Sequence, residues 1–146
     1  MRRMLCVGVI LLLGFGATAT RAEAQSGSEN RDRGFQLQQN YPNPFNPVTR
    51  IPFALGAELF QAGQPVRVTI RIYTVLRELV AVPTALNHPQ GNRTAIDKLE
   101  YPGPGNYLAY WDGLDRDGRK VASGIYYVLL EVNGKKAAPL PITVAK

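Results

Sequence analysis

The chain has 146 residues, a formal net charge of +6 and one cysteine, Cys6. This length allows one ordinary domain with short extensions, and a lone cysteine excludes an internal disulfide. The excess of basic residues is modest and scattered, whereas nucleic-acid binding requires a clustered basic face with interleaved aromatic residues. The composition therefore predicts no nucleic-acid partner and a domain that depends on its apolar core for stability.

The first 24 residues have the pattern of a signal peptide. Arg2 and Arg3 form a positive start, Val7–Leu13 is a short apolar run, and an A-x-A cleavage site ends at Ala24. The apolar run is shorter than the ~20 residues that a membrane helix requires. We expect cleavage after Ala24 and export of a mature chain that has neither a transmembrane span nor a cysteine, which excludes a thiol nucleophile and a cysteine metal site.

The mature chain is expected to begin with a disordered polar leader at residues 25–34 and to continue as one folded domain at 35–146. In several short segments of this domain, apolar residues alternate with polar ones, which predicts half-buried antiparallel strands. Strands are predicted at 49–55, 66–73, 76–82, 94–99, 107–111, 125–132 and 142–145. Because turn signals are frequent and no amphipathic helix is present, this pattern predicts an all-β sandwich.

Two of these strands have features that predict their position in a sheet. Pro52 faces away from Ile51 and Phe53 and predicts an edge strand or a bulge, because proline has no N–H to donate. In the segment 125–132 both faces are apolar, which predicts a covered or central strand. The Asn133-Gly134 pair that follows is a strong hairpin-turn signal.

Residues 40–47 contain three prolines, which fix φ and push each preceding residue into an extended conformation. We expect a rigid, irregular segment that holds Tyr41 and Phe45 in fixed directions. These two side chains either plug one end of the sandwich or form an aromatic contact surface. The plug is the favoured interpretation, because large apolar groups are usually buried.

No group of residues predicts catalysis. His88 is the only histidine and lies in a loop, where a solvated residue is favoured over a catalytic or metal-binding one. Asp97 and Glu100 lie near each other, but they lack the cleft and the defined separation of a carboxylate pair. The sequence therefore predicts a protein that is not an enzyme and binds no cofactor.

Asp112, Asp115 and Asp117 precede Gly118 and form a weak calcium-binding candidate. Their D-x-x-D-x-D spacing departs from the EF-hand pattern, and the twelfth position would be Ser123 instead of glutamate. Asp-Gly pairs are favoured in turns for backbone reasons alone. Turn architecture is therefore favoured over a calcium site.

Two longer motifs are similar to those of a known family. The segment 39–55, QNYPNPFNPVTRIPFAL, strongly resembles the N-terminal signature of the C-terminal sorting domains of the type IX (Por) secretion system. The segment 110–130, YWDGLDRDGRKVASGIYYVLL, resembles the W-D-G…D-x-x-G…V-A-S-G-x-Y block of that family, which the immunoglobulin-like domain of the flagellar hook-capping protein shares. Between them, VRVTIRIYTVLRELV is similar to the family's next strand and turn. Family members often have Asp and Gly where Thr74 and Arg77 stand here.

The resemblance covers residues 35–146 and implies an immunoglobulin-like antiparallel β-sandwich of about seven strands. It also implies a structural role for the motif residues, with Trp111 as a core anchor: Asn40, Pro42, Pro44, Phe45, Pro47, Trp111, Asp112, Gly113, Gly118, Gly124 and Tyr126. The exposed C-terminal strand at 139–146 is the element that we expect a receptor to recognise, with Ile142, Val144 and Lys146 as its candidate residues.

The function that the resemblance implies is non-enzymatic sorting of an exported protein. The chain would pass through the periplasm, be recognised by the outer-membrane secretion machinery, and reach the cell surface or the medium. Such domains normally follow a large cargo, whereas here the predicted signal peptide leads almost directly into the domain. The alternative is a freestanding immunoglobulin-like envelope protein that binds a protein or glycan through an exposed strand edge and surface tyrosines such as Tyr73 and Tyr127.

Overall fold

The computed structural model describes residues 33–146, which form an all-β structure with one short 3-10 helix. The predicted signal peptide and all but the last two residues of the predicted leader lie outside the described residues. No helix within the described part is long and apolar enough to cross a membrane. The elements are β1 (Phe35–Leu37), β2 (Thr49–Leu55), η1 (Ala57–Phe60), β3 (Val66–Tyr73), β4 (Leu79–Ala81), β5 (Thr84–Leu86), β6 (Leu99–Tyr101), β7 (Gly105–Trp111), β8 (Gly124–Val132), β9 (Lys135–Lys136) and β10 (Leu140–Val144).

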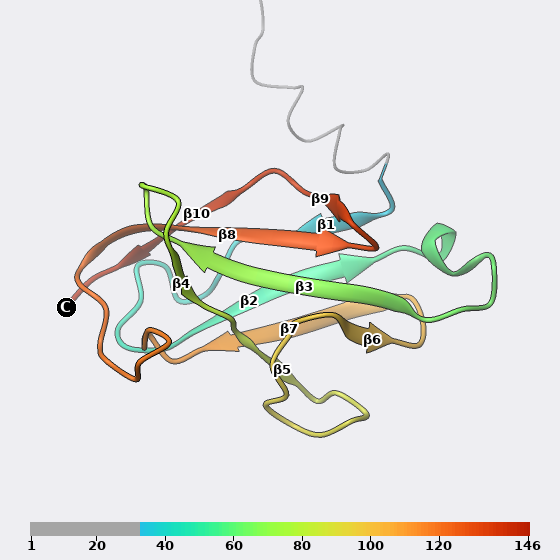
Figure 1. Ribbon diagram of the computed structural model, residues 1–146, viewed down its shortest axis with the longest axis horizontal. Coiled ribbons are helices and arrows are strands. Elements are labelled where there is room, and N and C mark those ends of the chain that lie inside the picture. Colours follow the sequence, from blue (N-terminus) through green and yellow to red (C-terminus); the bar gives the residue numbers. More distant parts are fainter. Residues whose placement is uncertain (1–32) are drawn as a thin grey trace, which may run out of the picture.

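The strands form two antiparallel sheets that share one core (Figure 1). One sheet has the order β1-β2-β7-β5, and the other has the order β10-β8-β3-β4, with β6 added to β3 and β9 added to β8. Aromatic side chains of the two sheets meet in edge-to-face contacts: the ring centroids of Phe53 and Tyr101 are 5.5 Å apart, and those of Trp111 and Tyr126 are 5.8 Å apart. The described residues contain ten strands, more than the expected seven or so, because five of them have only two or three residues.

The long strands confirm the predicted alternation. In β3 the residues Val66, Val68, Ile70 and Ile72 are buried, and in β8 the buried residues are Tyr126, Val128, Leu130 and Val132. β8 lies between β10 and β3 and is therefore central, as its two apolar faces predicted. Burial of such a side chain stabilises the fold by about 1.5–3 kcal/mol, so these two strands supply much of the core.

The hairpin predicted at Asn133-Gly134 is also confirmed. It joins β8 to β9 with Val132 opposite Lys135, and both turn residues have positive φ, 49° and 83°. The Asn133 side chain also accepts a hydrogen bond from the backbone N–H of Arg67 at 2.9 Å, which ties the turn to the start of β3.

Two strand predictions between residues 76 and 99 were wrong in their bounds. β4 covers only 79–81, and residues 94–98 lie outside any strand, while the short strands β5 and β6 were missed. The segment 93–98 crosses between the two sheets. The N–H of Ala85 in β5 bonds to the carbonyl of Thr94 at 2.7 Å, and the N–H of Ile70 in β3 bonds to that of Ile96 at 2.9 Å. Because this segment forms hydrogen bonds first with one sheet and then with the other, it does not form a regular hydrogen-bond ladder with either.

The edge strand or bulge predicted from Pro52 was also wrong, because β2 pairs with β1 on one side and β7 on the other in an unbroken register. Pro52 is tolerated there for a local reason. Its carbonyl accepts the N–H of Gln38 at 2.9 Å, so the side of Pro52 that lacks an N–H faces the end of β1 and not the long ladder with β7. Proline therefore costs this central strand no ladder bond to β7.

The turn between β3 and β4 explains both departures from the family pattern. The Thr74 hydroxyl accepts the N–H groups of Leu76 and Glu78, each at 3.2 Å, which is the role that an Asp carboxylate would have. Arg77 has φ of 64°, in the left-handed region where glycine is favoured. The turn is therefore retained, with the Thr74 hydroxyl as acceptor in place of a carboxylate and with Arg77 in a strained backbone conformation.

We expect Arg77→Gly to raise the free energy of unfolding by about 0.5–1 kcal/mol. The left-handed conformation costs a residue with a Cβ about 1–2 kcal/mol, and the greater freedom of glycine in the unfolded chain offsets part of that gain. Thermal unfolding followed by circular dichroism measures the shift. Arg77→Ala keeps the Cβ and serves as the control; an equal gain in this variant would contradict the explanation.

Candidate functional site

The two motif segments, 39–55 and 110–130, and the strand β10 meet at one end of the molecule (Figure 1). The backbone N–H of Phe45 donates to the carbonyl of Thr143 at 3.0 Å, and the N–H of Ala145 donates to the carbonyl of Phe45 at 3.0 Å. Phe45 and Val144 therefore form a parallel bridge between segments about 100 residues apart. Residues 43–45 thus act as a clasp on β10.

A row of three aromatic rings fills the core behind this clasp. Phe45 is buried and lies edge-on to Trp111 at 5.4 Å between centroids, and Trp111 lies edge-on to Tyr126 at 5.8 Å. Trp111 is 2% exposed, as expected for a core anchor. The predicted plug is confirmed for Phe45 but not for Tyr41, which is 46% exposed because it lies on the outer side of the same irregular segment.

A buried polar network holds the proline-rich segment in place. The Asn40 amide donates to the Thr49 hydroxyl at 3.0 Å and to the carbonyl of Pro42 at 3.2 Å, and the Thr49 hydroxyl donates to the same carbonyl at 3.1 Å. All three X–Pro bonds of the segment are cis. The role of Thr49 was missed, although a polar residue in register with Ile51 and Phe53 on the inner face was its signal.

The W-D-G turn packs directly against the proline-rich segment. Gly113 has φ of 75°, and a Cβ added there would lie 2.4 Å from the carbonyl oxygen of Pro47. Only glycine combines this backbone conformation with so close an approach. Gly113 and Pro47, one from each motif, therefore fix the distance between the two motifs.

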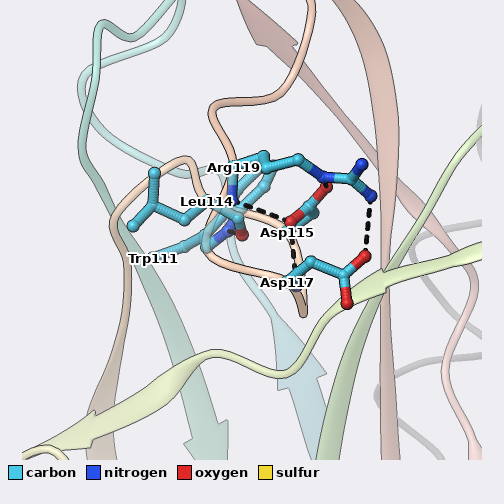
Figure 2. Close-up of polar contacts among 5 residues, drawn as sticks. All are labelled: Trp111, Leu114, Asp115, Asp117 and Arg119. Atoms are coloured by element: carbon cyan, nitrogen blue, oxygen red, sulfur yellow. Dashed lines mark hydrogen bonds and ion pairs between the residues drawn. The ribbon is translucent and has the colours of Figure 1, made fainter.

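Hydrogen bonds within the loop 111–120 define its shape (Figure 2). The Trp111 indole Nε1–H donates to the carbonyl of Leu114 at 2.9 Å, and Asp112 Oδ1 accepts the N–H of Leu114 at 3.0 Å. Asp115 Oδ1 accepts the N–H groups of Asp117 and Arg119, both at 2.9 Å. The turn interpretation is confirmed by these backbone bonds.

The three aspartates do not converge on a common point that could hold a cation. The Arg119 guanidinium pairs with Asp115 Oδ2 at 3.3 Å and with Asp117 Oδ2 at 2.6 Å, while Asp112 caps its own turn. Within residues 33–146 no group of three or more His, Cys, Asp or Glu side chains is placed to bind a metal. The arginine supplies the positive charge beside these carboxylates.

The backbone N–H of Arg119, then that of Asp117, and the Arg119 charge hold the pKa of Asp115 below its ordinary value of 3.8. As the pH falls, Asp115 is therefore protonated in the unfolded chain before it is protonated in the folded domain. The free energy of unfolding should thus fall as pH drops below about 4. We expect Asp115→Asn to make this decline shallower. Urea denaturation from pH 5 to pH 2 measures both slopes, and equal slopes would contradict the assignment.

Tyr126 closes the end of this loop. Its hydroxyl donates to the carbonyl of Ala122 at 2.9 Å, just before Gly124 starts β8. Burial raises the pKa of the Tyr126 hydroxyl. Tyr126 therefore remains a neutral donor at physiological pH and links the loop to the aromatic row.

The outer edge of β10 is less accessible than the sequence predicted. Thr143 directs its N–H to Asn43 Oδ1 at 3.3 Å and its carbonyl to Phe45, and Pro141, two residues earlier on the same side, has no N–H. Ile142 and Val144 are buried in the core. These two candidate recognition side chains are therefore inaccessible in the folded domain, whereas Lys146 is exposed.

The residues considered for catalysis, His88, Asp97 and Glu100, each make a structural contact with another part of the fold. His88 is buried, which corrects the solvated interpretation: its Nδ1 accepts the N–H of Gln90 at 3.1 Å, so Nε2–H donates to the carbonyl of Glu100 at 2.8 Å. Its ring also lies edge-on to Tyr101 at 4.7 Å. The Asp97 carboxylate pairs with Arg71 at 3.3 Å, and Glu100 pairs with Arg67 at 3.7 Å.

No protein-family model and no curated protein matches the chain. Among solved structures, it is similar to PorZ, a surface component of the type-IX secretion system of Porphyromonas gingivalis, with a TM-score of 0.42 and 20% identity over 84% of this chain and 13% of that one. It is also similar to the alkylpurine DNA glycosylase AlkC of Pseudomonas fluorescens, with a TM-score of 0.48 and 14% identity over 77% of this chain and 31% of that one. The chain spans less than a third of either protein, and at these TM-scores neither likeness assigns a function.

Proposed function

We propose that the chain is a non-enzymatic domain with an immunoglobulin-like β-sandwich that directs sorting to the cell surface by the type IX secretion system. Its support in the sequence is the resemblance of segments 39–55 and 110–130 to the sorting-domain motifs. The single observation that carries the proposal is the meeting of both motifs with β10, through the Phe45 clasp and the Phe45–Trp111–Tyr126 row. The motifs thus build one composite end of the domain.

The structural contacts of the polar side chains support a non-enzymatic role. The aspartates of the W-D-G loop cap turns and pair with Arg119, and His88 lies in the core. In this proposal the chain crosses the inner membrane by its signal peptide. The outer-membrane secretion machinery then recognises the folded domain in the periplasm and delivers it to the cell surface.

The proposed recognition element is the outer surface of residues 139–146 together with the clasp that covers it. Because Ile142 and Val144 are buried, a receptor for the folded domain would contact Lys146, the side chain of Thr143 and the adjoining segment 43–46. This surface is formed by two segments that are far apart in the sequence, 43–46 and 139–146. It therefore exists only after the domain has folded.

The test is delivery of a fluorescent protein fused ahead of residues 25–146, behind the signal peptide, in a bacterium with a type IX system. We expect fluorescence at the surface that is lost in a strain without the translocon. A second variant, Lys146→Glu with Thr143→Lys, should lower delivery while its protease resistance stays that of the parent fusion. A folded parent fusion that stays in the periplasm of the competent strain contradicts the proposal.

A second candidate is a freestanding immunoglobulin-like envelope protein that binds a protein or glycan. The observation that favours it is the outer face of the central strand β8, where Ile125 is 52% exposed and Tyr127 is also exposed. Apolar residues on an open face of a sheet are typical of contact surfaces. Recovery of a stable envelope partner together with normal secretion of the cargo in its absence would favour this candidate.

A further inference from the structure

Exposed apolar side chains gather at one place on the six-stranded sheet. Of the five large hydrophobic residues exposed among residues 33–146, all but Tyr41 lie here: Val75, Leu76, Ile125 and Tyr127. Tyr73 of β3 is opposite Tyr127 of β8, and the two strands are antiparallel. The turn after β3 therefore lies near the start of β8 (Figure 1). Val75 of this turn and Tyr127 of β8 line one hollow, which brings the two segments together, while Leu76 and Ile125 lie near them in the chain but outside its lining.

The most exposed members of the patch are held at the tip of a well-defined turn. Val75 is 61% exposed and Leu76 is 78% exposed. The N–H of Thr74 donates to the carbonyl of Glu78 at 2.9 Å, and the N–H of Arg77 donates to the carbonyl of Thr74 at 3.0 Å. Together with the two bonds to the Thr74 hydroxyl, four hydrogen bonds fix the turn that exposes these two apolar side chains to solvent. A pre-organised turn loses little conformational entropy when it binds.

Beside this turn lies a hollow of about 690 Å³ with an apolar floor and a basic rim. Its lining includes Tyr73, Val75, Arg77, Tyr127, Lys136 and Pro139, and no Asp or Glu lines it. Neither Arg77 nor Lys136 forms an ion pair within the described part of the chain. Glu78 follows on the same turn but lies outside the lining. The hollow therefore combines apolar surface with two free positive charges.

We propose that this surface, formed by the 74–77 turn, Tyr127 and Lys136, is a docking site for an acidic segment of a partner protein. A large apolar side chain of that segment packs against Val75, Leu76 and Tyr127, and its carboxylates pair with Arg77 and Lys136. Aromatic and arginine residues are the side chains most often decisive in such interfaces. The proposal rests on the second candidate function. Its surface shares only Pro139 with the proposed recognition element at 139–146, and neither Leu76 nor Arg77 belongs to that element.

The test uses a randomised heptapeptide library displayed on phage and selected on the immobilised mature chain. We expect selected sequences with one aromatic or large aliphatic residue flanked by two or more acidic residues. A synthetic peptide of the selected sequence should bind Leu76→Ser and Arg77→Glu at least tenfold more weakly. Lys98→Glu makes the matched charge change at the exposed Lys98, outside the hollow, and should bind as the parent does.

Several outcomes would overturn the proposal. Selection of basic or uncharged peptides, or of peptides that bind Leu76→Ser and the parent equally, would reject an acidic partner at this patch. Sedimentation that shows a dimer lost in Leu76→Ser would assign the patch to a second copy of the chain. Binding to phosphatidylglycerol vesicles that is lost in the same variant would assign it to a lipid surface. Delivery of the Leu76→Ser fusion, measured in parallel, separates failure here from failure of the sorting role.

Discussion

Trp111→Ala is expected to lower the free energy of unfolding by about 3–5 kcal/mol, the usual cost of truncating a large buried aromatic side chain. Trp111 is the middle ring of the row that joins the two motifs, and its removal leaves Phe45 and Tyr126 beside a cavity. It also removes the indole donor of the Leu114 carbonyl. Urea denaturation of the mature chain, followed by circular dichroism, measures the loss.

Trp111→Phe separates the ring contacts from the hydrogen bond. Phenylalanine keeps most of the apolar contact but leaves the Leu114 carbonyl without the indole N–H, for which we expect a loss of about 1–2 kcal/mol. If Trp111→Ala cost less than the phenylalanine variant, the ring would not be a core anchor. A loss confined to thermal stability of the loop, without a change in global unfolding, would lead to the same conclusion.

Gly113→Ala is the second large effect, with an expected loss of about 2–5 kcal/mol. Its left-handed backbone costs an alanine about 1–2 kcal/mol. Its Cβ would also lie 2.4 Å from the carbonyl oxygen of Pro47, and relief of such overpacking costs about 1–3 kcal/mol more. The clash is with backbone, which cannot rotate away as a side chain could. Equilibrium denaturation of the variant gives the total.

Gly118→Ala is the matched control for this prediction. Gly118 has φ of 78°, close to that of Gly113, but a Cβ added there meets nothing within 4 Å. We expect the backbone cost alone, about 1–2 kcal/mol. The difference between the two variants therefore measures the contact between the motifs. Equal losses in Gly113→Ala and Gly118→Ala would show that the approach of Pro47 contributes nothing.

The regular part of the fold was predictable because burial imposes a period of two on each long strand. β2 and β3 have the predicted bounds, and β7 and β8 differ from the predicted bounds by one or two residues, since most inner residues of these strands are apolar. The short strands β5 and β6 were not predictable in this way. Each has three residues, too few for a period, and the crossing segment 93–98 between them bonds to both sheets.

The candidate site was predictable as a set of residues but not as a set of contacts. The motifs identified Phe45, Trp111 and Tyr126, and their burial follows from their size and apolar character. The backbone clasp on β10 has no sequence signal, because an N–H and a carbonyl are common to nearly every residue. The burial of His88 was missed for a related reason: its partners are backbone groups of Gln90 and Glu100, which no motif specifies.

The clasp also sets an order of events during synthesis of the chain. Residues 43–45 emerge early, but their partners at 143–145 follow about 100 residues later. Until those residues arrive, the backbone N–H and carbonyl of Phe45 lack their partners, and the edge of β8 that pairs with β10 is open. A chain stopped short of β10 is therefore open at this end and prone to pairing with other chains. The clasp can therefore close only after residues 143–145 have been synthesised.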